Sequence, residues 1–192
     1  MDLQVMFDEL KTHFGKLISL TPEEFAYVSS HFTSRKFRKH QFLVQQGAPV
    51  MHDFFVIKGL LKSSFVNEQG KEHILQLAME DWWISDYQAY FNQTDATLDI
   101  TCFEDVEVLC LSLANREKLC SEMHQIEYFF RKKSNAGYIA LQRRILSFMN
   151  HSAAERYHEL LQIYPSLAQR VPKTLLASYL GVSRETLSRL SA

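Results

Sequence analysis

The chain has 192 residues, of which 46% are hydrophobic and 22% are charged, and its formal net charge at pH 7 is −1. This balance excludes a disordered chain, and no apolar run approaches the roughly 18 residues that a membrane-spanning helix needs. The N-terminus has no basic segment ahead of an apolar run, so it does not resemble a secretion signal. Three cysteines without a CxxC spacing favour free thiols, and we therefore expect a cytoplasmic protein with one large or two small domains.

The charge is divided unevenly along the chain. Residues 1–129 hold 11 Lys and Arg against 19 Asp and Glu, a net charge of −8, whereas residues 130–192 hold 10 against 3, a net charge of +7. A basic C-terminal part is expected where that part alone contacts phosphates. A chance division of solvated charge is the alternative.

The first thirty residues predict short helices. Thr21-Pro22-Glu23-Glu24 combines an N-cap, a proline at the first helical position and a glutamate at the third, which is a capping box.

From about Phe37 to Leu113 the apolar residues recur with a period of two. The short apolar segments end at turn signals, of which Asn67-Glu68-Gln69-Gly70 predicts a hairpin turn. Short strands with regularly spaced turns are typical of a β-barrel or jelly roll. We therefore predict an α+β protein with an N-terminal double-stranded β-helix (jelly-roll) barrel and flanking helices.

A long helix is predicted at about 115–150, beginning at Asn115 as its N-cap. Its apolar residues recur mostly at three- and four-residue spacing, at Leu119, Met123, Ile126, Phe130, Tyr138, Leu141, Ile145 and Phe148. One small barrel cannot cover so long a stripe, so we expect a coiled-coil seam and a homodimer. The alternative is packing on the chain's own barrel, because Lys133 and Gly137 interrupt the heptad.

A second capping box, Ser152-Ala153-Ala154-Glu155, predicts a new helix from Ala153 to about Ile163. We place the domain boundary at about residue 150. The predicted domains are a sensor barrel with the dimerisation helix, 1–150, and a DNA-binding domain, 151–192.

The last twenty residues predict a helix-turn-helix, a motif that reads the DNA major groove. Gly181 suits the left-handed turn, and Ser183 caps the second helix. The small core between the helices is predicted to contain Leu176, Leu180, Val182 and Leu187.

Three exposed positions of the second helix fit base edges. Arg184 can make a bidentate contact to guanine, and Glu185 can accept from cytosine N4. Arg189 lies one turn later and can reach a guanine or a phosphate. The predicted contacts to double-stranded DNA are Lys173 and Thr174, for phosphates, with Ser183, Arg184, Glu185, Thr186 and Arg189. A structural helix with a charged surface is the alternative.

This order of parts resembles the Crp/Fnr family of bacterial transcription regulators along nearly the whole chain. The resemblance rests on Leu43 to Lys62 in the barrel, on Tyr164 to Pro172, and on Leu180 to Arg189, which matches the family's recognition motif almost letter for letter. It implies a dimeric, sequence-specific transcription regulator, not an enzyme, whose barrel holds an unidentified effector. It also assigns the base-reading roles to Arg184, Glu185 and Arg189.

The sensor half departs from the family members that bind cyclic AMP. Those members carry a phosphate cassette with a Gly, a Glu and an Arg, whereas the corresponding stretch here, Glu80 to Leu98, has no Gly and no Arg. Its four acids would repel a phosphate. We therefore expect no cofactor and a degenerate cyclic AMP site.

Aromatic residues in this stretch are candidates for an effector pocket: Trp82, Trp83, Tyr87 and Tyr90. The alternative is that these rings fill a core or a subunit contact. No HxH pair, P-loop or HExxH is present, so we predict no metal site and no catalytic residues.

Two other functions stay open at this point. One is a small-molecule sensor with impaired DNA binding, since the sequence stops at Ser191-Ala192 with no wing or basic tail. The other is a cupin-like metal enzyme, which bound metal would identify.

Overall fold

A computed structural model describes residues 2–190, apart from the side chain of Ala168. The chain forms two compact units. The first comprises the residues up to Phe65 and Gln76–Lys132, and the second comprises Val66–Leu75 and the residues from Lys133 onward. This grouping does not test the functional boundary near residue 150, which stays a prediction.

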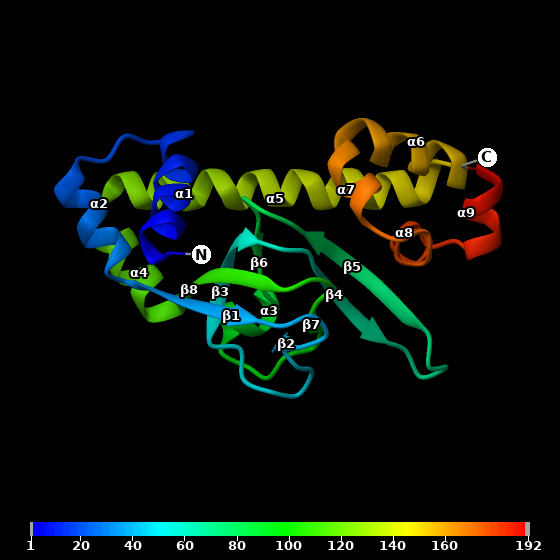
Figure 1. Ribbon diagram of the computed structural model, residues 1–192, viewed down its shortest axis with the longest axis horizontal. Coiled ribbons are helices and arrows are strands. Elements are labelled where there is room, and N and C mark those ends of the chain that lie inside the picture. Colours follow the sequence, from blue (N-terminus) through cyan, green and yellow to red (C-terminus); the bar gives the residue numbers. More distant parts are fainter. Residues whose placement is uncertain (1, 191–192) are drawn as a thin grey trace. The chain divides into compact units, whose positions relative to one another are not determined.

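The chain forms two four-stranded antiparallel sheets, as a jelly-roll-like barrel requires, and all their residues outside Val66–Leu75 belong to the first unit (Figure 1). Their strand orders are β1-β8-β3-β6 and β2-β7-β4-β5. The strands are β1 (Phe32–Phe37), β2 (Phe42–Val44), β3 (His52–Lys58), β4 (Leu61–Val66), β5 (Glu72–Ala78), β6 (Trp83–Ile84), β7 (Asp99–Cys102) and β8 (Val106–Ser112). The helices that begin in this unit are α1 (Leu3–Gly15), α2 (Pro22–Ser29), α3 (Tyr87–Asn92), α4 (Leu113–Glu122) and α5 (His124–Asn150). The predicted α+β jelly-roll fold is confirmed.

Strand β3 is buried on both faces because two separate clusters cover it. Phe54 and Val56 belong to the cluster inside the barrel, whereas Phe55 and Ile57 belong to the cluster formed with α1, α2, α4 and the start of α5. Successive side chains of a strand point to opposite faces, so a continuous apolar run serves both clusters.

A buried ion pair joins strand β3 to helix α4. Asp53 Oδ2 accepts from Arg116 Nη1 at 3.0 Å, and Tyr87 donates to the other carboxylate oxygen at 3.3 Å. The guanidinium also lies 4.1 Å from the centre of the Phe130 ring. Burial raises the pKa of Asp53 to about 7, although Arg116 and Tyr87 lower it. Each buried charge therefore depends on the other.

The structure differs from the sequence prediction in two elements of the first unit. The period-two pattern places the first strand after Phe37, but strand β1 begins at Phe32 and pairs with β8 along its length. The predicted continuous helix at 115–150 is wrong, because Met123 has an extended backbone between α4 and α5. The N-cap is Ser112, whose hydroxyl accepts from the Asn115 amide at 3.2 Å, so Asn115 is not the cap.

The second unit is built from the C-terminal helices, the rest of α5 and the segment Val66–Leu75. It contains α6 (Ala153–Ile163), α7 (Pro165–Arg170), α8 (Lys173–Leu180) and α9 (Arg184–Leu190). The buried apolar side chains of its C-terminal part, from α6 onward, are Leu160, Leu167, Val171, Leu176, Ala177, Leu180 and Leu187.

The two capping boxes and the hairpin turn that the sequence predicts are confirmed. Both capping boxes are present, at Thr21 with Glu24 and at Ser152 with Glu155. The hairpin turn closes with a hydrogen bond from the Gly70 amide to the Asn67 carbonyl at 2.9 Å. None of the helices within residues 2–190 is long and apolar enough to cross a membrane.

Candidate nucleic-acid interface

Helices α8 and α9 form the predicted helix-turn-helix. Gly181 adopts the left-handed conformation, with φ of 70°, at the end of α8. The Val182 amide donates back to the Ala177 carbonyl at 2.9 Å, which closes the C-terminus of the helix. Any side chain at residue 181 would also meet Phe148, because a Cβ atom there lies 2.9 Å from its ring. Both the backbone conformation and the close approach require glycine.

The second helix begins as predicted, at Ser183. The Ser183 hydroxyl accepts from the Thr186 amide at 3.1 Å, and the Thr186 hydroxyl lies 3.1 Å from it. Leu187 of α9 is fully buried, and Leu176 and Leu180 of α8 are buried as well. Val182, which we also expect in this core, is half-buried.

The charged side chains of α9 are on its exposed side. Arg184, Glu185 and Arg189 are all exposed. Hydrogen bonds from the backbone amide of Glu185 and from Ser183 hold the pKa of this carboxyl below its ordinary value, and the two arginines act in the same direction. The carboxylate is therefore ionised at neutral pH and able to accept a hydrogen bond.

The N-terminus of α8 carries the two predicted phosphate contacts. Lys173 and Thr174 are exposed in its first turn. Pro172 precedes them and provides no side-chain cap. Uncapped amides at a helix N-terminus favour an anion such as a phosphate.

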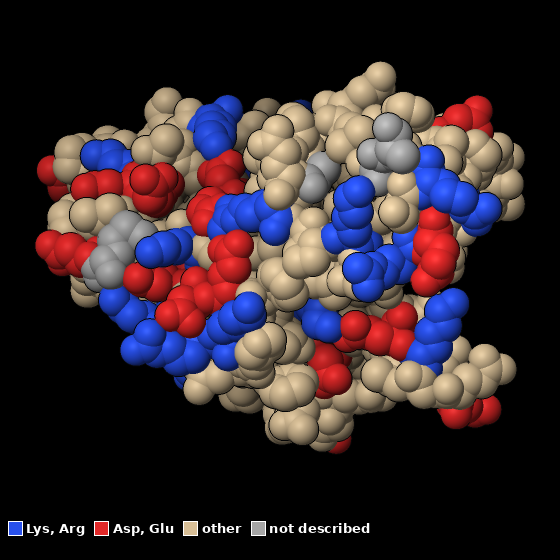
Figure 2. Space-filling view, turned by 45° about the vertical axis from the view of Figure 1, so that its right-hand side comes forward, with Lys and Arg blue, Asp and Glu red and all other residues tan. Residues whose placement is uncertain are grey.

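The charged side chains of α8 and α9 are of both signs, since Lys173, Arg184 and Arg189 are basic and Glu185 is acidic. On the face that Figure 2 shows, the Lys and Arg side chains are interspersed with Asp and Glu. The candidate interface is thus defined by the residues of α8 and α9 and not by a large surface of one sign.

Two arginines that the sequence analysis missed hold the turn in place. Arg156 donates from Nε and Nη2 to the Leu180 carbonyl, at 3.2 and 3.0 Å, and Arg144 donates to the Tyr179 carbonyl at 3.0 Å. Both guanidinium groups also lie near the Phe148 ring, at 5.0 and 5.4 Å from its centre. No local sequence pattern signals these contacts, because they join residues 24 and 35 positions apart.

In the stretch that corresponds to the cyclic AMP cassette, Glu80 to Leu98, several hydrogen-bond donors bind a carboxylate of the same stretch. Asp86 is buried, and its carboxylate accepts from the amides of Ala89, Thr97 and Leu98, at 3.2, 2.7 and 3.2 Å. The Thr97 hydroxyl donates to it as well, at 2.8 Å. A cyclic phosphate would meet a carboxylate here instead of free donors. The residues present do not fit that ligand.

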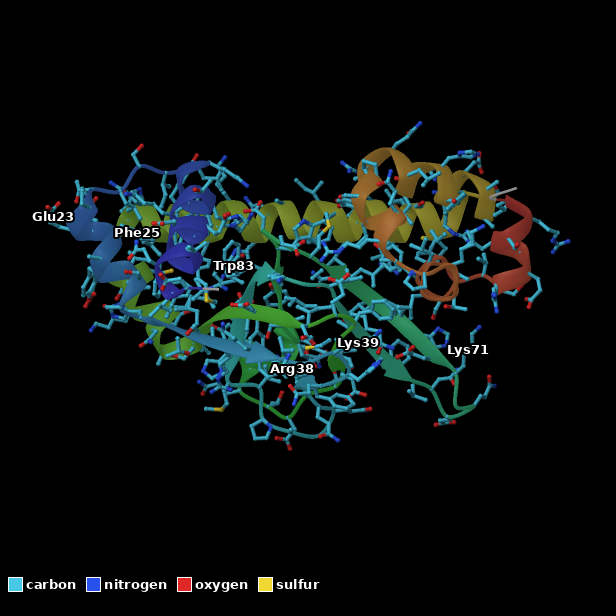
Figure 3. All side chains as sticks on the ribbon, in the orientation of Figure 1. Glu23, Phe25, Arg38, Lys39, Lys71 and Trp83 are labelled. Carbon is cyan, nitrogen blue, oxygen red and sulfur yellow. The ribbon has the colours of Figure 1, made fainter. Side chains whose placement is uncertain are left out.

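The four aromatic residues predicted to line an effector pocket each contact different partners. Trp82 packs on the cluster inside the barrel, whereas Trp83 packs on the other cluster and donates from Nε1 to His13 Nε2 at 3.0 Å (Figure 3). Tyr90 is buried and donates to the Leu111 carbonyl at 3.2 Å. Tyr87 donates to the carboxylate of Asp53, as described above. These contacts account for the rings without a ligand, and an effector role for them stays an untested prediction.

Two surface hollows, of about 310 and 470 Å³, are lined by other residues. Within residues 2–190, no three His, Cys, Asp or Glu side chains are grouped as a metal site would require. The predicted absence of a cofactor and of a metal is not tested further by this geometry.

Replacing Gly181 tests the turn. Gly181→Ala is expected to destabilise the second unit by about 1–3 kcal/mol, because alanine resists a positive φ and its Cβ meets Phe148. The control is Gly137→Ala in α5, where no atom lies within 4 Å and stability should rise by about 0.5–1 kcal/mol. Thermal unfolding followed by circular dichroism measures both, and equal effects would contradict this account of the turn.

Replacing Asp86 tests the internal carboxylate. Asp86→Asn should cost about 2 kcal/mol or more, since an amide NH₂ then faces the donors of Thr97 and Leu98. The exposed Asp95→Asn change is the control and should alter stability little. Neither variant nor the wild type should melt higher with cyclic AMP added. A rise in melting temperature with cyclic AMP would show that the cassette still takes the nucleotide.

Comparison with known proteins agrees with this fold. Residues 34–123 match the family model of the cyclic nucleotide-binding domain. A comparison with curated protein sequences found no significant match.

Solved structures of bacterial regulators are similar over most of the chain. FixK2 from Bradyrhizobium japonicum is 16% identical with a TM-score of 0.67, over 83% of this chain and 82% of that one. A putative transcriptional regulator of the Crp/Fnr family from Eubacterium rectale is 13% identical with a TM-score of 0.65, over 89% and 82%. The catabolite activator protein of Thermus thermophilus is 21% identical with a TM-score of 0.55, over 90% and 83%. Residues 34–123 thus match the cyclic nucleotide-binding domain, and the chain has the fold of the Crp/Fnr regulators.

Proposed function

We propose that the protein is a dimeric, sequence-specific DNA-binding transcription regulator of the Crp/Fnr type. The observation that carries the proposal is helix α9, which is capped by Ser183, anchored by buried Leu187 and exposes Arg184, Glu185 and Arg189. A short helix with one buried apolar side and one exposed charged side is suited to binding in the major groove. The solved regulators with the same fold support it.

The roles of the individual residues follow from their positions. Arg184 and Glu185 lie in the first turn of α9, where base edges are read, and Arg189 follows Glu185 by about one turn. Lys173 and Thr174 at the start of α8 hold phosphates and fix the register. Ser183 and Thr186 keep the N-terminus of α9 in place.

An exposed apolar face of α5 supports the dimer. Within the second unit, Tyr138 is 70% exposed, Ile145 is 58% exposed and Met149 is 74% exposed. Leu141, on the same side of the helix, is 52% exposed. A contiguous apolar helix face of this kind is expected to be covered by a second copy of the same helix. The second copy would place two recognition helices about one DNA turn apart, roughly 34 Å.

The proposal leaves out cyclic AMP as the signal. An effector in the barrel remains part of the family's pattern, but the Asp86 carboxylate gives the cassette no vacant donors for an anion.

Arg184→Ala tests the base-reading role. A preferred site is first selected with the wild-type protein from a pool of random duplexes, and binding is then measured by fluorescence anisotropy. The variant should lose about 1–3 kcal/mol at one base pair and no longer distinguish substitutions there. Arg38→Ala removes an exposed arginine of the first unit and should bind as the wild type does. Equal wild-type affinity for every duplex would rule out sequence-specific regulation.

Ile145→Glu tests the dimer. A charge in the apolar face should shift the protein from dimer to monomer in analytical ultracentrifugation, because the seam would bury an unpaired carboxylate. Ala136→Glu introduces the same charge at an exposed position on the opposite side of the same helix and should leave the dimer intact. A monomeric wild-type protein, or dimers of equal stability in both variants, would contradict a seam at this face.

A further inference from the structure

A surface hollow of about 310 Å³ lies between helices α5 and α6 of the second unit. Its lining includes two apolar side chains, Ile139 and Leu146, a cation, Arg143, and a carboxylate, Glu159. Pockets that hold small ligands have volumes from about 300 Å³ upward, so this hollow has room for a small organic molecule. Its mixture of apolar and charged groups limits the ligands that it fits.

The carboxylate of the hollow is held in place by the protein itself. The Ser147 hydroxyl donates to Glu159 Oε2 at 2.6 Å and lies 3.2 Å from His151 Nδ1. Ser147 is buried, whereas Glu159 is half-buried. The main chain beside them is fixed as well, because Arg156 donates to the His151 carbonyl at 2.8 Å. The acidic wall is therefore positioned before any ligand binds, which lowers the cost of binding one.

The cation of the hollow has no partner. Arg143 precedes Ser147 by four residues, so the two side chains lie on the same face of α5. Within residues 2–190, Arg143 forms no hydrogen bond through its side chain and no ion pair, with Glu159 or with any other acid. The same hollow thus contains a guanidinium and a carboxylate that do not pair with one another.

The other lining residues fit the remaining parts of a ligand. Ile139 is 55% exposed and Leu146 is 49% exposed, and both lie within one helical turn of Arg143. The amides of Gln142 and Asn150 also line the hollow and have no side-chain partner among the residues that the structure describes. Apolar surface beside a few polar groups that can fix an orientation is typical of a small-molecule site.

The hollow lies away from the proposed dimer seam. Arg143 and Ser147 are each two residues from Ile145, which places them about 160° from it around α5. A second copy that covers the exposed apolar face would therefore leave the hollow open to solvent.

We propose that this hollow binds a free amino acid with an apolar side chain. The Arg143 guanidinium donates two parallel hydrogen bonds to the carboxylate of the ligand, the arrangement that this group favours. The ammonium group of the ligand donates to Glu159, and its side chain covers Ile139 and Leu146. An amino acid carries both charges on one carbon atom, so a single small molecule satisfies the unpaired cation and the positioned carboxylate together. A simple anion or a simple amine satisfies only one of them. This site does not depend on DNA binding.

Isothermal titration calorimetry on the full chain tests the site directly. The probes are leucine, isoleucine, valine, methionine and phenylalanine, and at least one should bind with a Kd below about 1 mM. Analogues of the tightest binder that lack one charge should bind at least about tenfold more weakly, because each leaves one charged group of the hollow unpaired. For leucine these analogues are isocaproate, without the ammonium group, and isoamylamine, without the carboxylate. No binding of any of the five amino acids at millimolar concentration would overturn the proposal, as would an analogue that binds as tightly as its parent.

Two variants assign the binding to the hollow. Arg143→Ala removes an exposed side chain that has no partner, so the fold should be kept while affinity falls by about tenfold or more. Glu159→Gln keeps an oxygen that accepts from Ser147 but removes the charge, and it should weaken binding to a similar extent.

The matched controls remove the same charges elsewhere. Arg131→Ala lies in α5 outside the hollow, and Glu68→Gln lies in the hairpin turn. Both should bind the amino acid as the wild type does, and circular dichroism should show all four variants folded. Wild-type affinity in folded Arg143→Ala or Glu159→Gln protein would show that the amino acid binds elsewhere, against the proposal.

Discussion

The second unit depends on two guanidinium groups that satisfy main-chain carbonyls. The last carbonyls of a helix have no partner within the helix, and α8 ends at Tyr179 and Leu180 against Arg144 and Arg156. An arginine offers five donors in a fixed plane, so one side chain can bridge carbonyls of different segments. The turn at Gly181 is thereby fixed from α5 and α6, and the direction of α9 is fixed with it. Every contact that α9 is proposed to make with DNA requires this arrangement.

The first unit shows a different use of charge. Buried Asp53 and Arg116 satisfy one another, and Asp86 satisfies the amides around α3. In the stretch that corresponds to the cyclic AMP cassette, the Asp86 carboxylate accepts from the amides of Ala89, Thr97 and Leu98. The fold of the barrel does not depend on a bound nucleotide, because the sheets are packed against the two apolar clusters. A proposed DNA-binding helix α9 and a stretch Glu80 to Leu98 without the cyclic AMP cassette are thus compatible within one chain.

The sequence predicts most of the local structure because local structure rests on short-range contacts. Capping boxes, the hairpin turn at Gly70 and the left-handed Gly181 involve residues close together in the chain, and all are found as predicted. Strand β1 is not predicted, since only its ends are apolar and pairing with β8 defines it. The break at Met123 also escapes prediction, because the apolar spacing continues across it.

The sequence by itself determined the helix-turn-helix, the period-two barrel and the absence of an arginine from the stretch Glu80 to Leu98. These features depend on residue types at fixed spacing, which a single chain displays directly. Only the tertiary structure decided that the pocket aromatics have separate partners, and that Arg144, Ser178 and the hairpin segment Val66–Leu75 meet. Those contacts join residues 21 to 106 positions apart, and their geometry follows from packing, which no local pattern encodes.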